Sequence, residues 1–186
     1  MTVRSARRRT GLALVGVVTL ATALLFPATS AQASDTTVVF TLDAGALTIS
    51  APASSSLGHG AAGTALSAAL GPVTVNDGRA LLTASWVATA SSTDFTTGGG
   101  TPAETISKAN VSYWSGPATS TTGVGVFTPG QLTALLATSL SAPRTAFTLT
   151  LGVGNNSATW NPTLIVNLPS AAVAGTYTGT ITHSVA

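Results

Sequence analysis

The chain has 186 residues, of which 45% are hydrophobic and only 6% are Asp, Glu, Lys or Arg, with a formal charge of +2. The absence of cysteine excludes a disulfide framework, a thiolate zinc site, a cysteine nucleophile and a lipid-modified cysteine. Two histidines and five acidic residues leave an enzyme few groups for general acid–base catalysis.

Residues 1–33 have the three parts of a secretory signal peptide. Arg4, Arg7, Arg8 and Arg9 precede an uncharged, mainly apolar run over 11–26; Pro27 ends that run, and Ala31-Gln32-Ala33 supplies a small-x-small cleavage pattern. A membrane-spanning helix needs about 20 apolar residues, so the shorter run favours cleavage over an uncleaved anchor. We therefore predict a leader over 1–33, a mature domain over 34–186 and a location outside the cell.

Removal of the leader changes the charge of the protein. The mature chain keeps three positive side chains, on Arg79, Lys108 and Arg144, against five acidic ones, so its net charge becomes −2. Nucleic-acid binding needs a clustered basic stripe, and these three residues are scattered. We expect no nucleic-acid partner and, after cleavage, no membrane association.

Alternation of apolar residues with threonine predicts strands from the start of the mature chain. Two strands are expected over 37–42 and 46–51, around the turn-prone Asp43-Ala44-Gly45. A hairpin is expected between 73–76 and 80–89, because Asn76-Asp77-Gly78 suits a tight turn with positive φ. The stretches 53–65 and 92–104 have no strand period and are expected to be loops.

The second half of the chain continues this pattern. A possible capping box over 128–131, followed by leucines, indicates one short helix or a loop. The segment 145–151 places Phe147, Leu149 and Leu151 on one face, and 163–169 repeats the alternation. The last segment, 175–185, puts His183 on the same face as its apolar residues. Short strands with Gly and Pro between them predict one all-β domain, an antiparallel β-sandwich of immunoglobulin-like type.

Candidate catalytic groups are few and lack motif support. His59 lies in a Gly- and Ala-rich loop, and for His183 a packed core position is favoured over a ligand or base. No serine lies in a Gly-x-Ser-x-Gly elbow, and a Ser–Lys pairing through Lys108 has no motif behind it. The acidic residues are too far apart for a calcium loop. We expect no catalytic residues, no metal site and no cofactor.

Aromatic residues offer a more specific signal. Exposed Trp and Tyr side chains commonly stack on sugar rings, since they combine a flat apolar face with a polar tip. Tyr113 and Trp114 are neighbours in an expected strand, so one should face the core and the other solvent. Trp86 and Trp160 each belong to an alternating run, which favours the core.

Several segments resemble the WxL-domain surface proteins of Gram-positive bacteria. Residues 72–79, PVTVNDGR, are similar to that family's VTVTDTRG segment, and Trp86-Val87-Ala88, followed by the similar 92–95, lies at its first Trp-x-Leu. The C-terminal WNPTL and AGTYT segments resemble the family's ending. Ala88 replaces the Leu of the first motif, and His183-Ser184-Val185 replaces the second motif, as in a degenerate, actinobacterial-type member.

The resemblance implies a surface protein held on the cell wall without a covalent link, through peptidoglycan. No Leu-Pro-x-Thr-Gly sorting signal is present, which agrees with non-covalent retention or release. The candidate ligand-binding residues are Trp86, Asp94, Tyr113 and Trp114. The expected function is wall association without catalysis, with cell-wall glycan as the partner; the alternative is a structural or adhesion module that binds another surface protein.

Overall fold

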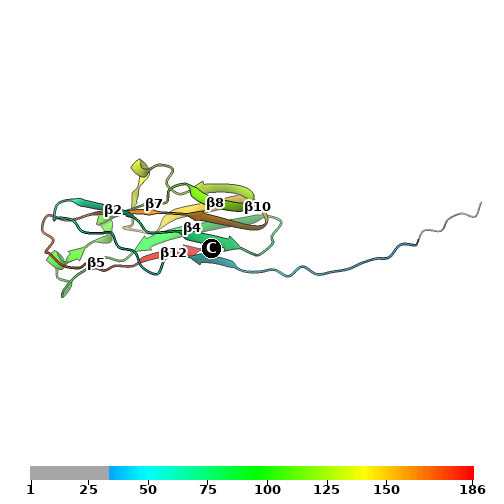
Figure 1. The fold of residues 1–186 in the computed structure, drawn as a ribbon, viewed down its shortest axis with the longest axis horizontal. Coiled ribbons are helices and arrows are strands. Elements are labelled where there is room, and N and C mark those ends of the chain that lie inside the picture. The colour runs from blue at the N-terminus through cyan, green and yellow to red at the C-terminus, as the bar shows by residue number, and fades with distance from the viewer. Residues whose placement is uncertain (1–33) are drawn as a thin grey trace, which may run out of the picture. The chain divides into compact units, whose positions relative to one another are not determined.

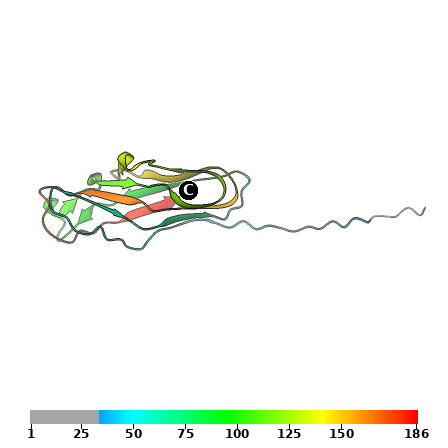
Figure 2. The ribbon, with the colours of Figure 1, turned by 45° about the horizontal axis from the view of Figure 1, so that its top comes forward.

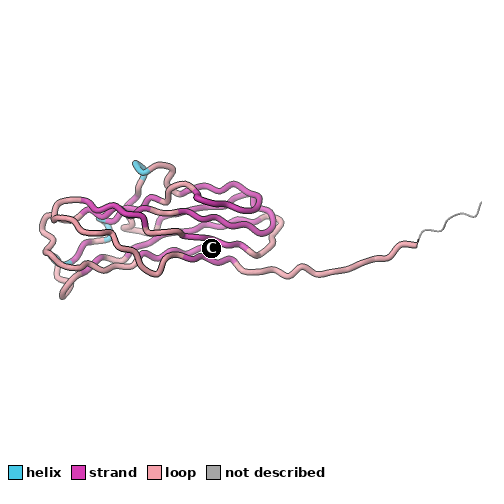
Figure 3. Tube along the Cα trace, in the orientation of Figure 1, coloured by secondary structure: helices cyan, strands magenta, loops and turns pink. Residues whose placement is uncertain are grey.

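The computed structural model describes residues 34–186, so the predicted leader lies outside the described residues. Residues Thr41–Ala186 form one compact unit. All regular elements of the described part are β-strands apart from three short 3-10 turns (Figure 3), and every strand pair is antiparallel. The all-β, antiparallel prediction is confirmed. Within 34–186 no helix is long and apolar enough to span a bilayer.

The larger sheet is built around one long strand, β10, which runs over Arg144–Trp160. The first half of β10 pairs with β4 and its second half with β3, so β3 and β4 follow one another along the same edge. β8 pairs with β10 across both halves and therefore occupies the opposite edge. β1 and β12 complete the sheet beside β3 and β4. The other bounds are β1 Leu47–Ser50, β3 Val73–Asp77, β4 Ala84–Ser92, β8 Ala118–Pro129 and β12 Ile181–Val185.

The smaller sheet has the strand order β2-β11-β7-β9. Its bounds are β2 Ala65–Ala69, β11 Thr163–Asn167, β7 Val111–Trp114 and β9 Thr138–Ser139. β5 Phe95–Thr96 and β6 Thr105–Ile106 form a two-stranded ribbon. The 3-10 turn η1 Pro102–Glu104 lies between these strands, η2 Lys108–Asn110 follows β6, and η3 Ala134–Leu136 precedes β9. Side chains of both sheets share one core, so the sheets form two layers. Figures 1 and 2 show their strands running along the long direction of the compact unit.

The core between the layers comes from residues that alternate along the strands. Trp86, Phe147 and Trp160 from the larger sheet and Tyr113 from the smaller sheet are all fully buried. The rings of Phe147 and Trp160 stack with centroids 5.0 Å apart. Aromatic side chains bury large apolar areas and dominate the energetics of a protein core. This arrangement is compatible with a β-sandwich.

The hairpin expected at Asn76-Asp77-Gly78 is wrong. β3 and β4 do not pair with each other; both pair with β10 instead. The reason lies in the Asp77 carboxylate, which accepts hydrogen bonds from the backbone N–H and the guanidinium of Arg79. Ala80 then adopts a positive φ of 53°, and the chain continues along β10 rather than folding back.

Other local expectations also differ from the structure. The loop expected over 92–104 contains β5, and the strand expected over 175–185 begins at Ile181. No strand forms over 37–42, where the backbone has no ladder partner among the described residues. The capping box expected over 128–131 does not form, because β8 extends to Pro129 and Gln131 bonds to Ser115, but the short helix or loop expected after it is present as η3. Leu151 leaves the face it was expected to share, because its φ of 54° lies at a register shift of β10 and turns its side chain into solvent.

Candidate functional site

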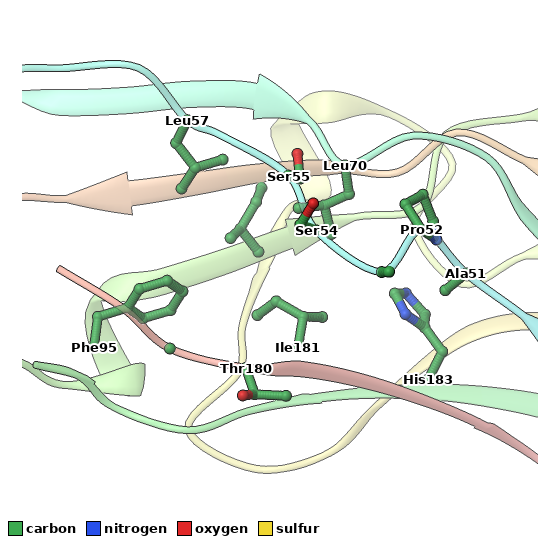
Figure 4. A pocket seen from close by; sticks show the side chains of 13 residues that line it. Ala51, Pro52, Ser54, Ser55, Leu57, Leu70, Phe95, Thr180, Ile181 and His183 are labelled. Atoms are coloured by element: carbon green, nitrogen blue, oxygen red, sulfur yellow. The ribbon is translucent and has the colours of Figure 1, made fainter. Parts of the chain in front are cut away.

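A pocket of about 180 Å³ lies on the β12 side of the compact unit. We call it the His183 pocket (Figure 4). It is lined by residues of β12, the segment between β1 and β2, and the ends of β2, β5 and β11: Ala51, Pro52, Ala53, Ser54, Ser55, Leu57, Leu70, Phe95, Leu164, Gly179, Thr180, Ile181 and His183. Its walls combine hydroxyl groups and one imidazole with aliphatic and aromatic side chains.

The chain shapes the pocket through two local features. The segment 51–57 passes from the larger sheet, at β1, to the smaller sheet, at β2, and covers the pocket with short side chains such as Ser54 and Ser55. Gly179 lies against the ring of Phe95, and a Cβ atom at this position would come within 2.7 Å of two ring carbons. The absence of a side chain at Gly179 therefore lets Phe95 form one wall.

His183 belongs to a hydrogen-bonded chain that begins in the core. Trp160 Nε1 donates to Tyr113 Oη over 3.1 Å. Tyr113 Oη lies 3.1 Å from His183 Nε2. Since the phenol already accepts the indole N–H, its own proton is free to be donated to Nε2. In this arrangement the imidazole proton is carried by Nδ1, while in the other tautomer Nε2 donates to the phenol oxygen.

Burial sets the charge state of this chain. It lowers the pKa of His183 to about 4 and raises the pKa of the Tyr113 phenol. At neutral pH both groups are therefore uncharged. A base with so low a pKa is a poor proton acceptor near neutrality, so the pocket is better suited to hydrogen bonding with an uncharged polar ligand than to proton transfer.

A second polar cluster lies at the junction of β3 and β4. The Asp77 carboxylate forms a bidentate pair with Arg79, at 2.8 and 2.9 Å, and Asn156 Nδ2 approaches it at 3.4 Å. Asn156 Oδ1 accepts the Trp86 indole N–H over 2.8 Å. The hydrogen bond from Arg79 is the largest cause of the lowered pKa of Asp77. Asp77 and Asn156 are buried and fully engaged with neighbouring strands, so this cluster fixes the fold.

The structure places the four predicted site residues in different surroundings. Trp86 is buried in the core, and Tyr113 is buried with its hydroxyl against His183. Trp114 lies on the opposite face of β7, half-buried, and its Nε1 has no hydrogen-bond partner within 34–186. Asp94 is exposed and accepts the backbone N–H of Lys108 over 2.7 Å. None of the four lines the pocket, and Tyr113 alone forms a side-chain hydrogen bond with a residue that does.

Sequence reasoning placed His183 correctly on the inward face of the last strand but did not find the pocket. Its other wall comes from 51–57, whose lack of periodicity gave no signal. His59 and Lys108, the other groups considered for chemistry, are exposed. Over residues 34–186, no three His, Asp or Glu side chains gather as a metal site would require.

Within residues 34–186 the structure thus has an uncharged pocket beside β12 and a long open sheet edge at β8. Comparison of the chain with protein-family models, with curated proteins and with solved structures finds no match.

Proposed function

We propose that the mature chain is exported as an immunoglobulin-like β-sandwich and acts at the cell surface as a structural or adhesion module without catalysis. Its partner is another surface protein, which it binds by strand pairing. The leader pattern over 1–33 supports export. The open edge of β8 is the observation that carries the mode of binding.

The edge of β8 is long and carries no charged side chain. β8 spans 12 residues, and no strand pairs with its outer side within the described part of the chain. Natural proteins usually blunt such an edge with lysine, with a proline inside the strand, with β-bulges or with a covering segment. The β8–β10 ladder shifts register near Gly123 and Gly125 and is regular over 126–129. β8 carries no charged residue, and its one proline, Pro129, is its last residue. An edge of this kind can accept an extended segment through backbone hydrogen bonds.

Variants that place charge on β8 test this proposal. The protein is secreted with its own leader, purified from the medium and coupled to a support for capture from a surface extract. Val124→Lys/Val126→Lys adds charges at two exposed positions of β8, whereas Val173→Lys adds one at an exposed position outside this strand. We expect captured surface protein to be lost with the β8 variant and kept with the control. Equal capture by both variants would refute edge binding.

Wall association through glycan is the second candidate, favoured by the His183 pocket and by the resemblance to WxL-domain proteins. Hydroxyl groups of Ser54 and Ser55, a neutral His183 and the ring of Phe95 are groups that bind sugars without charge. Co-sedimentation with insoluble peptidoglycan tests this candidate. His183→Phe, which fills the pocket, should reduce binding, while His59→Phe in an exposed loop should not. A protein that stays in the supernatant would exclude wall binding.

A further inference from the structure

The chain contains a second extended segment without a partner. Residues 36–42, with the sequence TTVVFTL, precede the first strand and pair with no other described residue. Their four large apolar side chains, on Val38, Val39, Phe40 and Leu42, are between 79% and 86% exposed. Proteins rarely expose such a strand-forming, uncharged segment to water unless it takes part in an interaction.

The segment has the side-chain pattern of a strand at a sheet surface. Val38, Phe40 and Leu42 lie on one side of an extended chain, and Thr37 and Thr41 lie on the other side together with Val39. Asp35 and Asp43 flank the segment but do not interrupt it. Pairing of these seven residues would therefore bury no ionised group.

The second half of β8 is the complementary surface. Along residues 124–129, Phe127 and Pro129 are half-buried at the rim of the core, while Val124 and Val126 are 64% and 51% exposed on the outer face. Further exposed apolar residues flank this part of β8 on β10 and in the connection to β9: Leu132, Leu135, Leu136, Leu151 and Val153. This concentration of exposed apolar side chains marks an interaction surface.

The lengths of the two segments agree. At about 3.3 Å per residue, seven residues of the extended segment span roughly 23 Å and the six residues 124–129 roughly 20 Å. Cross-strand neighbours lie on the same face of a sheet. A segment added to β8 would thus place Val38 and Phe40 beside Phe127, where they extend the rim of the core, and leave Thr37 and Thr41 on the outer face.

We propose that residues 36–42 of one copy add as a strand to the β8 edge of a second copy. This inference rests on the proposed function, because it names the partner of the same edge. The donor segment and the acceptor edge are different surfaces, so the contact is heterologous. Each copy that donates a strand still has its own β8 edge available, and copies add one after another into a filament unless the rotation closes a ring.

The experiment measures the mass of the secreted, purified chain against concentration, by sedimentation velocity and by light scattering. Mass spectrometry first establishes that residues 36–42 are present in the exported protein. Val38→Asp/Phe40→Asp disables the donor, Val124→Lys/Val126→Lys disables the acceptor, and Val173→Asp is the control. All five positions are exposed, so circular dichroism should show the same fold for every variant.

We expect the original chain and the control to form species larger than a dimer. Each disabled variant alone should be monomeric, with self-association weakened at least about tenfold, which corresponds to about 1.4 kcal/mol. A mixture of the two disabled variants should give a 1:1 heterodimer that grows no further, because one supplies the intact donor and the other the intact acceptor.

The other outcomes separate this inference from the proposed function. A monomeric original chain, or a donor variant that assembles normally, overturns the inference. If only the acceptor variant loses assembly and mixing restores nothing, the β8 edges of two copies pair with each other. That result refutes the donor role of residues 36–42 but leaves binding at the β8 edge intact. If the β8 variant still captures surface protein and also still assembles, both proposals fail.

Discussion

The hydroxyl of Tyr113 and the imidazole of His183 lie 3.1 Å apart and connect the two sheets. Tyr113 belongs to β7 of the smaller sheet, and His183 belongs to β12 of the larger sheet. The same phenol oxygen accepts the indole N–H of Trp160, on β10. One oxygen atom thus contacts side chains of β10 and β12, two strands of the larger sheet that β4 separates. Through this oxygen the core residue Trp160 is connected to His183 in the wall of the pocket.

Replacing this phenol with a phenyl ring should destabilise the protein. Tyr113→Phe leaves the buried Trp160 N–H without an acceptor and removes the partner of His183 Nε2. A buried unsatisfied group costs about 1–3 kcal/mol, so the free energy of unfolding in urea should fall by that amount. Tyr177→Phe is the control. The Tyr177 hydroxyl donates to backbone carbonyls near solvent, and its loss should cost about 1 kcal/mol or less. Equal losses would contradict the role of the Tyr113 hydroxyl.

The low pKa of His183 should make stability depend on pH between about 4 and its ordinary value of 6.5. In this range the unfolded chain binds a proton at residue 183 and the folded chain does not, so the free energy of unfolding rises with pH. The loss on acidification from 6.5 to 4 should reach at most about 3 kcal/mol.

Urea unfolding at several pH values measures this slope. His183→Phe removes the titrating group and should flatten the curve between pH 4 and 6.5. His59→Gln, at an exposed position, should leave the curve unchanged. A slope that persists in His183→Phe would show that another group causes it.

Strand alternation predicted much of this fold because burial follows a period of two. Leu164 and Val166 are buried as expected, and in β12 the inward row includes Ile181 and His183. The pairing of strands was less predictable. Asn76-Asp77-Gly78 favours a hairpin locally, but Asp77 instead binds Arg79 and Asn156. The Arg79 contact spans two residues, whereas Asn156 lies 79 residues further along the chain. The second contact, like the pairing of β3 with β10, crosses a sequence separation that a local pattern does not contain.

The candidate site was less accessible to sequence reasoning than the fold. Alternation favoured the core for Trp86 and for one of Tyr113 and Trp114, and Trp86 and Tyr113 are indeed buried. The partners of their polar atoms, Asn156 and His183, were not predictable. The tip of a buried aromatic ring can organise a site without exposing the ring. The segment 37–42 has the composition of a strand, yet a strand also requires an edge to pair with. The alternation of residues along one chain does not show which edge, if any, is available to the segment.

Removing the charge of Asp77 should weaken the junction of β3 and β4. In Asp77→Asn the bidentate ion pair with Arg79 is lost, although the side chain fits the same space. Hydrogen bonds to charged groups contribute about 1.5–3 kcal/mol, and we expect a loss of that size at neutral pH. Asp43→Asn, at an exposed position, is the control and should change stability little.

The same carboxylate predicts a second acid transition. The pKa of Asp77 is below the ordinary value of 3.8, chiefly because of its hydrogen bond with Arg79. Its contribution is therefore complete above that ordinary value and is lost as the pH falls through the lowered pKa. This range lies below the range of His183. Asp77→Asn should abolish the loss of stability below pH 3.8 and keep the rise of stability with pH between 4 and 6.5. The reverse result would show that Asp77 causes the upper transition and His183 the lower one.

Leu151 should be a position where glycine stabilises the protein. Its φ of 54° lies in the left-handed region, which costs a residue with a side chain about 1–2 kcal/mol. The side chain is 80% exposed, so Leu151→Gly removes little packing. Glycine increases the freedom of the unfolded chain, which offsets part of the gain.

We therefore expect Leu151→Gly to raise the free energy of unfolding by up to about 1 kcal/mol in urea titrations. Thr150→Gly tests the neighbouring exposed position, where φ is not positive. It should lower stability by about 0.5–1 kcal/mol, as glycine does within a strand. The opposite signs of two adjacent substitutions isolate the backbone conformation as the cause, because both positions are solvent-exposed. If both variants lose stability equally, the positive φ of Leu151 carries no strain.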